Sequence, residues 1–302
     1  MRASALALAA VVLVAGCGGS KSKESSSPAQ AGSIGSLLAQ PGPNVLLVGG
    51  TGDFAPGSIR YSFLIVRPNG APVYTPTARV AVADSLHSKP FVRTVARLEP
   101  VGVPGATTDS GDVSHLYVTH FSVPSAGKYV LVAVPVGSKP IQGATELDVR
   151  ERTKSPALGS KAVPSTTPTL ASTHGEVKAL TTRTPPDLAL LRYSVADSLR
   201  ARSPFVLVFA TPKFCASRTC GPVVDVALSV ARRFRGSGVR FIHVEVYQDN
   251  DPTKGYNRWM KEWRLPSEPW TFLVGRDGRI KAKFEGSVSA AELSAAVQRY
   301  LG

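Results

Sequence analysis

Apolar and polar residues alternate in short runs along the first half of the chain, up to about residue 150. This alternation predicts half-buried strands, because successive side chains of a strand point to opposite faces. Turn residues such as R-P-N-G separate the runs at a spacing typical of β-sandwiches. Five runs show the pattern: S-I-R-Y-S-F-L-I-V, A-R-V-A-V-A, F-V-R-T-V-A-R-L, H-L-Y-V-T-H-F-S-V and A-G-K-Y-V-L-V-A-V. Residues 42–150 are therefore predicted to form an all-β sandwich.

The pattern changes after residue 187, where helical periods alternate with buried strands. P-F-V-L-V-F-A and V-R-F-I-H-V-E-V-Y are continuous apolar runs, typical of strands covered on both faces. P-W-T-F-L-V-G-R-D-G-R-I-K-A-K-F-E-G is predicted to be a hairpin that turns at R-D-G. Helical periods occur in L-A-L-L-R-Y-S-V-A-D-S-L, P-V-V-D-V-A-L-S-V-A-R-R-F, Y-N-R-W-M-K-E-W and S-A-A-E-L-S-A-A-V-Q-R-Y-L. This order indicates an α/β domain over residues 187–302.

Two stretches without a hydrophobic period delimit these domains. Residues 17–41 are rich in Ser, Gly, Lys and Ala, and we expect them to form a flexible tether. Residues 151–186 are rich in Pro, Ser and Thr, which is typical of an extended linker. A chain of 302 residues is long enough for two domains of this size.

The start of the chain indicates export. In residues 1–16 one Arg precedes an apolar run too short to span a bilayer, which is typical of a secretory signal peptide. The sequence V-A-G-C, from Val14 to Cys17, resembles the bacterial lipobox. This resemblance implies cleavage before Cys17, acylation of its sulfur with a diacylglycerol and palmitate, and a lipoprotein anchored to the cell membrane. We expect it on the extracytoplasmic face, within the cell envelope; the alternative is an ordinary signal peptide that contains a cysteine.

The number of cysteines and the net charge limit the classes of function further. Lipidation of Cys17 would leave Cys215 and Cys220 as a pair, in a compartment that permits disulfides. The net charge is +14, but the basic residues are scattered and form no run interleaved with aromatic residues. We therefore expect no nucleic-acid partner.

The cysteine pair lies in F-C-A-S-R-T-C-G-P, between the first buried strand and the following helix. With the order of elements, this segment resembles the thioredoxin-fold domains of membrane-anchored extracytoplasmic bacterial proteins. The resemblance implies that Cys215 attacks a substrate and that Cys220 resolves the mixed disulfide. It also implies that Pro269 is a cis-proline, that Glu268 lies beside the substrate backbone, and that Trp270 lines the same groove. Other matching residues are Phe209, Gly221, Pro222 and Gly286.

The first domain has a weaker resemblance. S-x-G-x-Y-x-L, from Ser125 to Leu131, resembles the tyrosine corner of immunoglobulin-like domains. The resemblance implies an immunoglobulin-like sandwich in front of the thioredoxin-like domain, as a partner-docking surface or a spacer.

Four residues separate the two cysteines, where the thioredoxin family usually has two. On an ideal helix this spacing places the Cα atoms about 8.7 Å apart, beyond the limit of about 7 Å for a disulfide. If Cys215 and Cys220 pair, the A-S-R-T stretch must therefore be a loop. The start of the following helix, Lys213 and Arg218 would stabilise a thiolate, whereas the Glu268 carboxylate would raise the pKa of a nearby thiol.

These observations predict a thiol–disulfide oxidoreductase that acts on the thiols or disulfides of exported proteins and needs no diffusible cofactor or metal. One alternative is an inert disulfide, and another is a partner-binding scaffold without catalysis. A third is a Cu(I) carrier, because thiolates suit Cu(I). Copper-delivery relatives of thioredoxin use C-x-x-x-C-P with a later His. Here the single His of the domain is His243, within a strand, and Met260 is better explained as a core residue.

Overall fold

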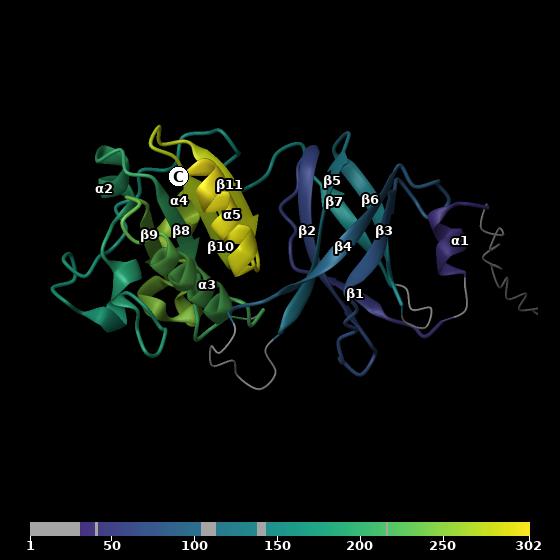
Figure 1. Cartoon of the computed structure of the whole chain (residues 1–302), viewed down its shortest axis with the longest axis horizontal. Coiled ribbons are helices and arrows are strands. Elements are labelled where there is room, and N and C mark those ends of the chain that lie inside the picture. The colour runs from purple at the N-terminus through teal and green to yellow at the C-terminus, as the bar shows by residue number, and fades with distance from the viewer. Residues whose placement is uncertain (1–30, 40–41, 104–112, 138–142, 216) are drawn as a thin grey trace, which may run out of the picture.

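The computed structural model describes residues 31–39, 42–103, 113–137, 143–215 and 217–302. They form a β domain and a C-terminal part of mixed helices and strands, which lie side by side (Figure 1). The predicted signal peptide, Cys17 and most of the tether lie outside the described residues. No helix in the described part of the chain is long and apolar enough to cross a bilayer.

The β domain is one antiparallel sheet of seven strands. The strand order is β1-β2-β5-β4-β3-β6-β7, and β1 also lies close to β7, so the sheet is nearly closed. Its interior is a single apolar core in which the rings of Tyr61, Phe63 and Tyr117 stack, with centroids 5.4 and 5.3 Å apart. The strands are β1 (Leu46–Gly49), β2 (Gly57–Val66), β3 (Thr77–Ala83), β4 (Val92–Pro100), β5 (His115–Val123), β6 (Gly127–Pro135) and β7 (Gly143–Val149).

The prediction of an all-β domain is confirmed, and all five predicted runs are strands. Hydrogen bonding continues through all seven strands, so the described strands do not separate into the two sheets of the predicted sandwich. The Tyr129 hydroxyl donates to the Ser125 carbonyl oxygen at 2.9 Å, which is the contact that a tyrosine corner requires. The immunoglobulin-like assignment itself stays a prediction.

A short helix, α1 (Ile34–Leu38), lies within the range predicted to be a flexible tether. The Ser33 hydroxyl accepts from the Ser36 N–H at 3.2 Å and caps the helix. Ile34 is fully buried against the outer face of β3 and β6, where Leu37 also packs. The apolar residues of I-G-S-L-L therefore hold this segment on the β domain.

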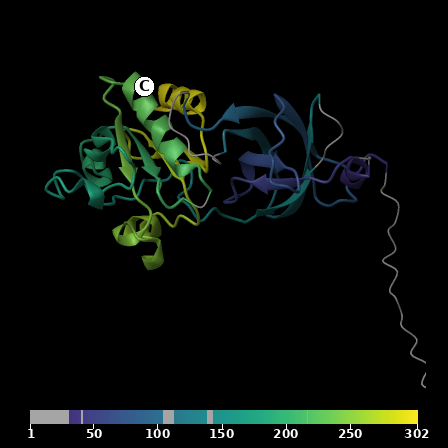
Figure 2. The same cartoon turned by 90° about the horizontal axis from the view of Figure 1, so that it is seen from below.

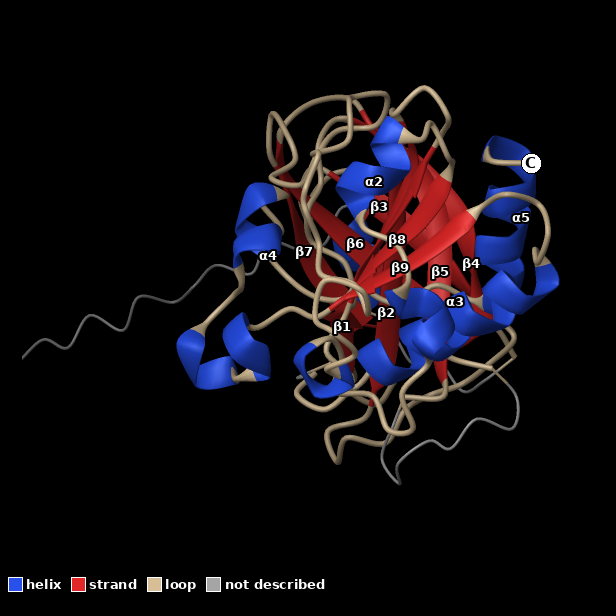
Figure 3. Ribbon diagram, turned by 90° about the vertical axis from the view of Figure 1, so that its left-hand side faces the viewer, coloured by secondary structure: helices blue, strands red, loops and turns tan. Residues whose placement is uncertain are grey.

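The C-terminal part has a four-stranded sheet in the order β11-β10-β8-β9. Only β8 and β9 are parallel. Helices α3 and α5 cover one face of this sheet and α4 covers the other (Figure 3). The elements are α2 (Val195–Arg200), β8 (Phe205–Phe209), α3 (Cys220–Arg233), β9 (Arg240–Val244), α4 (Arg258–Glu262), β10 (Trp270–Val274), β11 (Ile280–Glu285) and α5 (Ala290–Tyr300).

This order confirms the predicted succession of strand, cysteine loop, helix, strand, helix, hairpin and helix. Successive side chains of β8 point to opposite faces of the sheet, so the strand contributes to an apolar core on each face. Val206 and Val208 pack against α3 and α5, and Phe209 packs on the other face against Trp263, with ring centroids 5.6 Å apart. The central strand is thus buried on both faces, as its continuous apolar run indicates.

The predicted linker is largely extended, but it packs along the C-terminal part instead of hanging free. It contains the short 3-10 helix η1 (Val177–Ala179). The other 3-10 helices among the described residues are η2 (Leu188–Leu191), η3 (Gln248–Asn250) and η4 (Pro252–Lys254). The indole N–H of Trp263 donates to the Ser165 hydroxyl at 3.1 Å, and the Ala162 N–H donates to the Gly278 carbonyl at 2.9 Å. Figure 2 shows this segment passing from the β domain along the C-terminal part.

Candidate functional site

The cysteine pair lies where β8 passes into α3. Cys215 and Cys220 form a disulfide, and their Cα atoms are 5.9 Å apart. Helix α3 begins only at Cys220, and Arg218 has a left-handed φ of 55°. The described residues between the cysteines, 217–219, are therefore not helical, as the spacing requires for a bonded pair.

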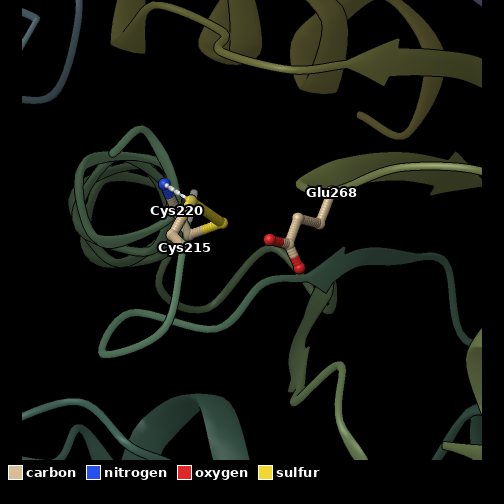
Figure 4. A group of neighbouring side chains, drawn as sticks. All are labelled: Cys215, Cys220 and Glu268. Carbon is tan, nitrogen blue, oxygen red and sulfur yellow. Dashed lines mark hydrogen bonds between the residues drawn. A yellow bond between two sulfur atoms is a disulfide. The ribbon is translucent and has the colours of Figure 1, made fainter. Parts of the chain in front are cut away.

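The two sulfurs have different environments. Cys220 is fully buried at the start of α3, whereas Cys215 is half-buried in the loop. The Cys220 N–H donates to the Cys215 sulfur at 3.2 Å (Figure 4). The Ser217 hydroxyl lies 3.3 Å from the same sulfur and 2.8 Å from the Thr219 hydroxyl. Donors at a helix start stabilise a thiolate. Cys215 is therefore the cysteine whose thiolate is stabilised and whose sulfur a substrate can contact.

Glu268 lies opposite the disulfide. The Glu268–Pro269 peptide bond is cis, in agreement with the predicted cis-proline, and it directly precedes β10. A Glu268 carboxylate oxygen and the two sulfurs lie within 4.8 Å of one another (Figure 4). The structure therefore brings together Cys215, Cys220 and Glu268, which are far apart in the sequence.

Two tyrosines near Glu268 were not predicted. Tyr247 and Tyr256 stack with ring centroids 5.8 Å apart, and the Tyr247 side chain is hydrogen-bonded to Glu268. The pKa of Tyr247 is raised, first by burial and then by the nearby Glu268 carboxylate. Both rings lie in the loop between β9 and α4, where no motif identifies them, so the sequence carried no signal for this contact.

The remaining predicted residues lie away from the sulfurs or within the core. The Lys213 ammonium is exposed and lies over the Phe214 ring, 5.2 Å from its centroid. Trp270 was predicted to line the groove, but its side chain is only 1% exposed and stacks on Phe272, because β10 is covered on both faces. Met260 is fully buried and has the predicted core role.

His243 is a buried strand residue, as predicted. It is 4% exposed, and its Nε2 lies 3.0 Å from the Ala210 carbonyl oxygen, so this nitrogen carries the proton. Burial lowers the pKa of His243; the Glu245 carboxylate and the bond to Ala210 oppose this shift, and Arg183 adds to it. The imidazole is therefore neutral at pH 7, and its role is the buried hydrogen bond to Ala210.

Because the pKa of His243 is lower in the folded chain than its ordinary value, the unfolded chain binds its proton first as the pH falls. We expect the stability supplied by neutral His243 to be complete above about pH 6.5 and to be lost below it, by up to about 1.4 kcal/mol per pH unit. Urea unfolding between pH 7.5 and 5 measures this. His243→Gln should reduce the dependence of the free energy of unfolding on pH, while His87→Gln, at an exposed position, should leave it unchanged. An unchanged profile in His243→Gln would contradict the assignment.

No family model and no curated protein matches the chain. Among solved structures, a thiol:disulfide interchange protein of the thioredoxin family from Chlorobium tepidum TLS matches with 14% identity and a TM-score of 0.32. The match covers 49% of this chain and 99% of that one. A likeness of this size does not establish a function. The structure itself shows the element order from β8 to α5, the cis bond before Pro269 and a bonded cysteine pair at the start of α3.

Proposed function

We propose that the protein is a thiol–disulfide oxidoreductase that acts on exported proteins. The observation that carries the proposal is the hydrogen bond from the Cys220 N–H to the sulfur of half-buried Cys215 at the start of α3. A donor in this place stabilises the thiolate that exchange needs. The buried Cys220 is suited to the resolving step, because a substrate cannot reach it before Cys215 reacts.

In the reducing direction, the Cys215 thiolate attacks a substrate disulfide, bonds to one sulfur and releases the other as a thiolate. Cys220 then loses its proton and attacks the Cys215 sulfur. This step forms the Cys215–Cys220 disulfide and releases the second substrate thiol. Two electrons pass from the dithiol to the substrate, and an external dithiol must then reduce the pair. The same steps in reverse would oxidise a substrate.

The proposed location rests on the sequence. The lipobox-like V-A-G-C that ends at Cys17 supports a signal peptide, a lipid anchor and the extracytoplasmic face of the membrane. A disulfide persists more readily in that compartment than in the cytoplasm. We further propose that the β domain is immunoglobulin-like, supported by the Tyr129–Ser125 contact; the β3–β4 pairing would then join the two layers of its sandwich into one continuous sheet.

Metal binding is the second candidate, because Glu268 adds a third ligand atom beside the two sulfurs. Cu(I) prefers soft sulfur ligands, and a carboxylate is a hard oxygen ligand. The three residues therefore fit a Cu(I) carrier less well than they fit thiol exchange.

Equilibration in glutathione and dithiothreitol buffers, followed by alkylation and mass analysis, tests the proposed function. The protein is the chain from residue 18 onward, which keeps every described residue. We expect a reversible Cys215–Cys220 couple between about −270 and −120 mV, the range of working oxidoreductases. A potential well below about −300 mV would instead identify a structural disulfide. Failure of the oxidised pair to form would favour the metal-binding or scaffold alternative.

A further inference from the structure

The β domain reaches the cysteine site through Glu285, the last residue of β11. The Glu285 carboxylate accepts from two backbone N–H groups in the turn between β1 and β2, from Gly52 at 2.7 Å and from Asp53 at 2.8 Å. Its other oxygen accepts from the Ser267 hydroxyl at 2.7 Å. One carboxylate therefore joins the turn of the β domain to the residue that precedes Glu268.

The segment from Ser267 to Pro269, here called the cis-Pro loop, is also held by two other bonds. The Trp270 indole N–H donates to the Ser267 hydroxyl at 3.1 Å, and the Gly286 N–H donates to the Pro269 carbonyl at 2.8 Å. Gly286 has a φ of 71°, and a side chain there would collide with the carbonyl oxygen of Gly50 in the β domain. The β domain thus approaches Gly286, whose N–H is bonded to the cis-Pro loop, so closely that glycine is required at this position.

The β domain also touches the other side of the site. Gly102, just after β4, lies against the start of α3, where a Cβ atom built on it would come within 3.3 Å of the Pro222 Cβ. Val103 packs against the apolar cluster that contains Cys220, as Cys215 also does. The β domain therefore contacts the helix that begins at Cys220 directly, and Glu285 links it to the loop that carries Glu268.

We propose that Glu285 is a positioning residue through which the β domain holds Glu268 opposite the cysteine pair and so sets the reduction potential of that pair. The inference rests on the proposed function and adds a role for the β domain, which is then part of the redox site and more than a spacer. Glu285 acts through the Ser267 hydroxyl and the cis-Pro loop, and it takes no part in the exchange itself.

The direction of the effect follows from electrostatics. A carboxylate within a few ångströms disfavours a thiolate, and a less stable reduced form gives a lower, more reducing potential. While Glu285 holds the loop, Glu268 stays beside the sulfurs and the pair is more reducing. When the hold is broken, we expect the Glu268 carboxylate to move toward water and the potential to rise.

The test is the glutathione equilibrium of Cys215–Cys220 in single and double variants of the chain from residue 18 onward. We expect Glu268→Gln to shift the equilibrium constant about tenfold toward the dithiol, about 30 mV. Glu285→Gln should shift it in the same direction by about threefold, about 14 mV. In the Glu268→Gln background, Glu285→Gln should cause no further shift, because its effect passes through the carboxylate that is now gone.

Glu292→Gln is the matched control. Glu292 also joins the two domains, through bonds of 2.7 and 2.8 Å to Arg60, but none of its hydrogen bonds described here reaches the cis-Pro loop. It should leave the potential unchanged. Ser267→Ala breaks the same link from its other end, and it decides the question if Glu285→Gln does not fold.

Three results would overturn this inference and leave the proposed function standing. They are an unchanged reduction potential in Glu285→Gln or Ser267→Ala, an undiminished shift when Glu285→Gln is made in the Glu268→Gln background, or an equal shift of the potential in Glu292→Gln. A wild-type chain without a reversible couple would overturn the proposed function and this inference with it. Catalysis of insulin reduction by the wild type, measured beside the potentials, separates these cases.

Discussion

Cys215→Ser is expected to abolish thiol–disulfide exchange, with a loss of activity on the order of 10³-fold or more. Cys215 is half-buried, and its sulfur accepts a hydrogen bond from the Cys220 N–H, so it is both accessible and stabilised as a thiolate. A serine hydroxyl stays protonated at neutral pH and cannot attack a disulfide. Reduction of insulin by dithiothreitol, followed by turbidity, measures this loss.

Cys220→Ser is expected to have a different result. Cys215 can still attack, but no second sulfur follows, so mixed disulfides with substrate proteins accumulate. They are detected as heavier bands on non-reducing gels and as added mass, both removed by dithiothreitol. Cys215→Ser should form no such adducts, because Cys220 is fully buried.

The double variant Cys215→Ser/Cys220→Ser is the control, since it removes both sulfurs from the same fold. Insulin reduction by the double variant at the wild-type rate would contradict the proposed function. Equal trapping by the two single variants would contradict the assignment of attacking and resolving roles, because it would mean that substrates reach both sulfurs.

The sequence predicted the features that local pattern and spacing control. The buried strand before Cys215 and the helix that follows the cysteine loop are both present. The cis bond before Pro269, which the family resemblance implied, is present as well. The spacing of the cysteines also required a loop between them, because helix geometry allows no disulfide at that separation. These inferences succeeded because each depends on residues that are close in the chain.

Features that depend on distant contacts could not be predicted in this way. Strand β1 has four residues and only one of them is buried, so it has no alternation to recognise. The packing of Ser165 against Trp263 is invisible in a Pro/Ser/Thr-rich composition, which suits an extended segment whether or not it is docked. The bonds from Gly52 and Asp53 to Glu285 join residues more than 230 positions apart, and an isolated Glu at a strand end carries no signal for them.

Asp53→Ala is expected to destabilise the junction between the β domain and the segment that follows it. The Asp53 side chain is fully buried, and its carboxylate accepts from the Lys154 N–H at 2.8 Å, the Ser155 N–H at 2.9 Å and the Ser155 hydroxyl at 2.7 Å. The Arg150 guanidinium also lies 3.4 Å away. Alanine would leave several buried donors without an acceptor, at a cost of about 3–5 kcal/mol.

This cost should lower the urea midpoint of unfolding by about 1–2 M, if the free energy of unfolding falls with urea concentration as it typically does for chains of this size. Proteolysis should also become faster in the segment after Arg150, because Asp53 is the acceptor that holds Lys154 and Ser155 in place. Asp148→Ala is the matched control, since Asp148 lies 3.9 Å from the same Arg150 guanidinium but is exposed. We expect that variant to change the free energy of unfolding by no more than about 0.5 kcal/mol. If both variants lowered the midpoint equally, the buried acceptor would not be what holds the junction, and the effect would come from the lost charge beside Arg150.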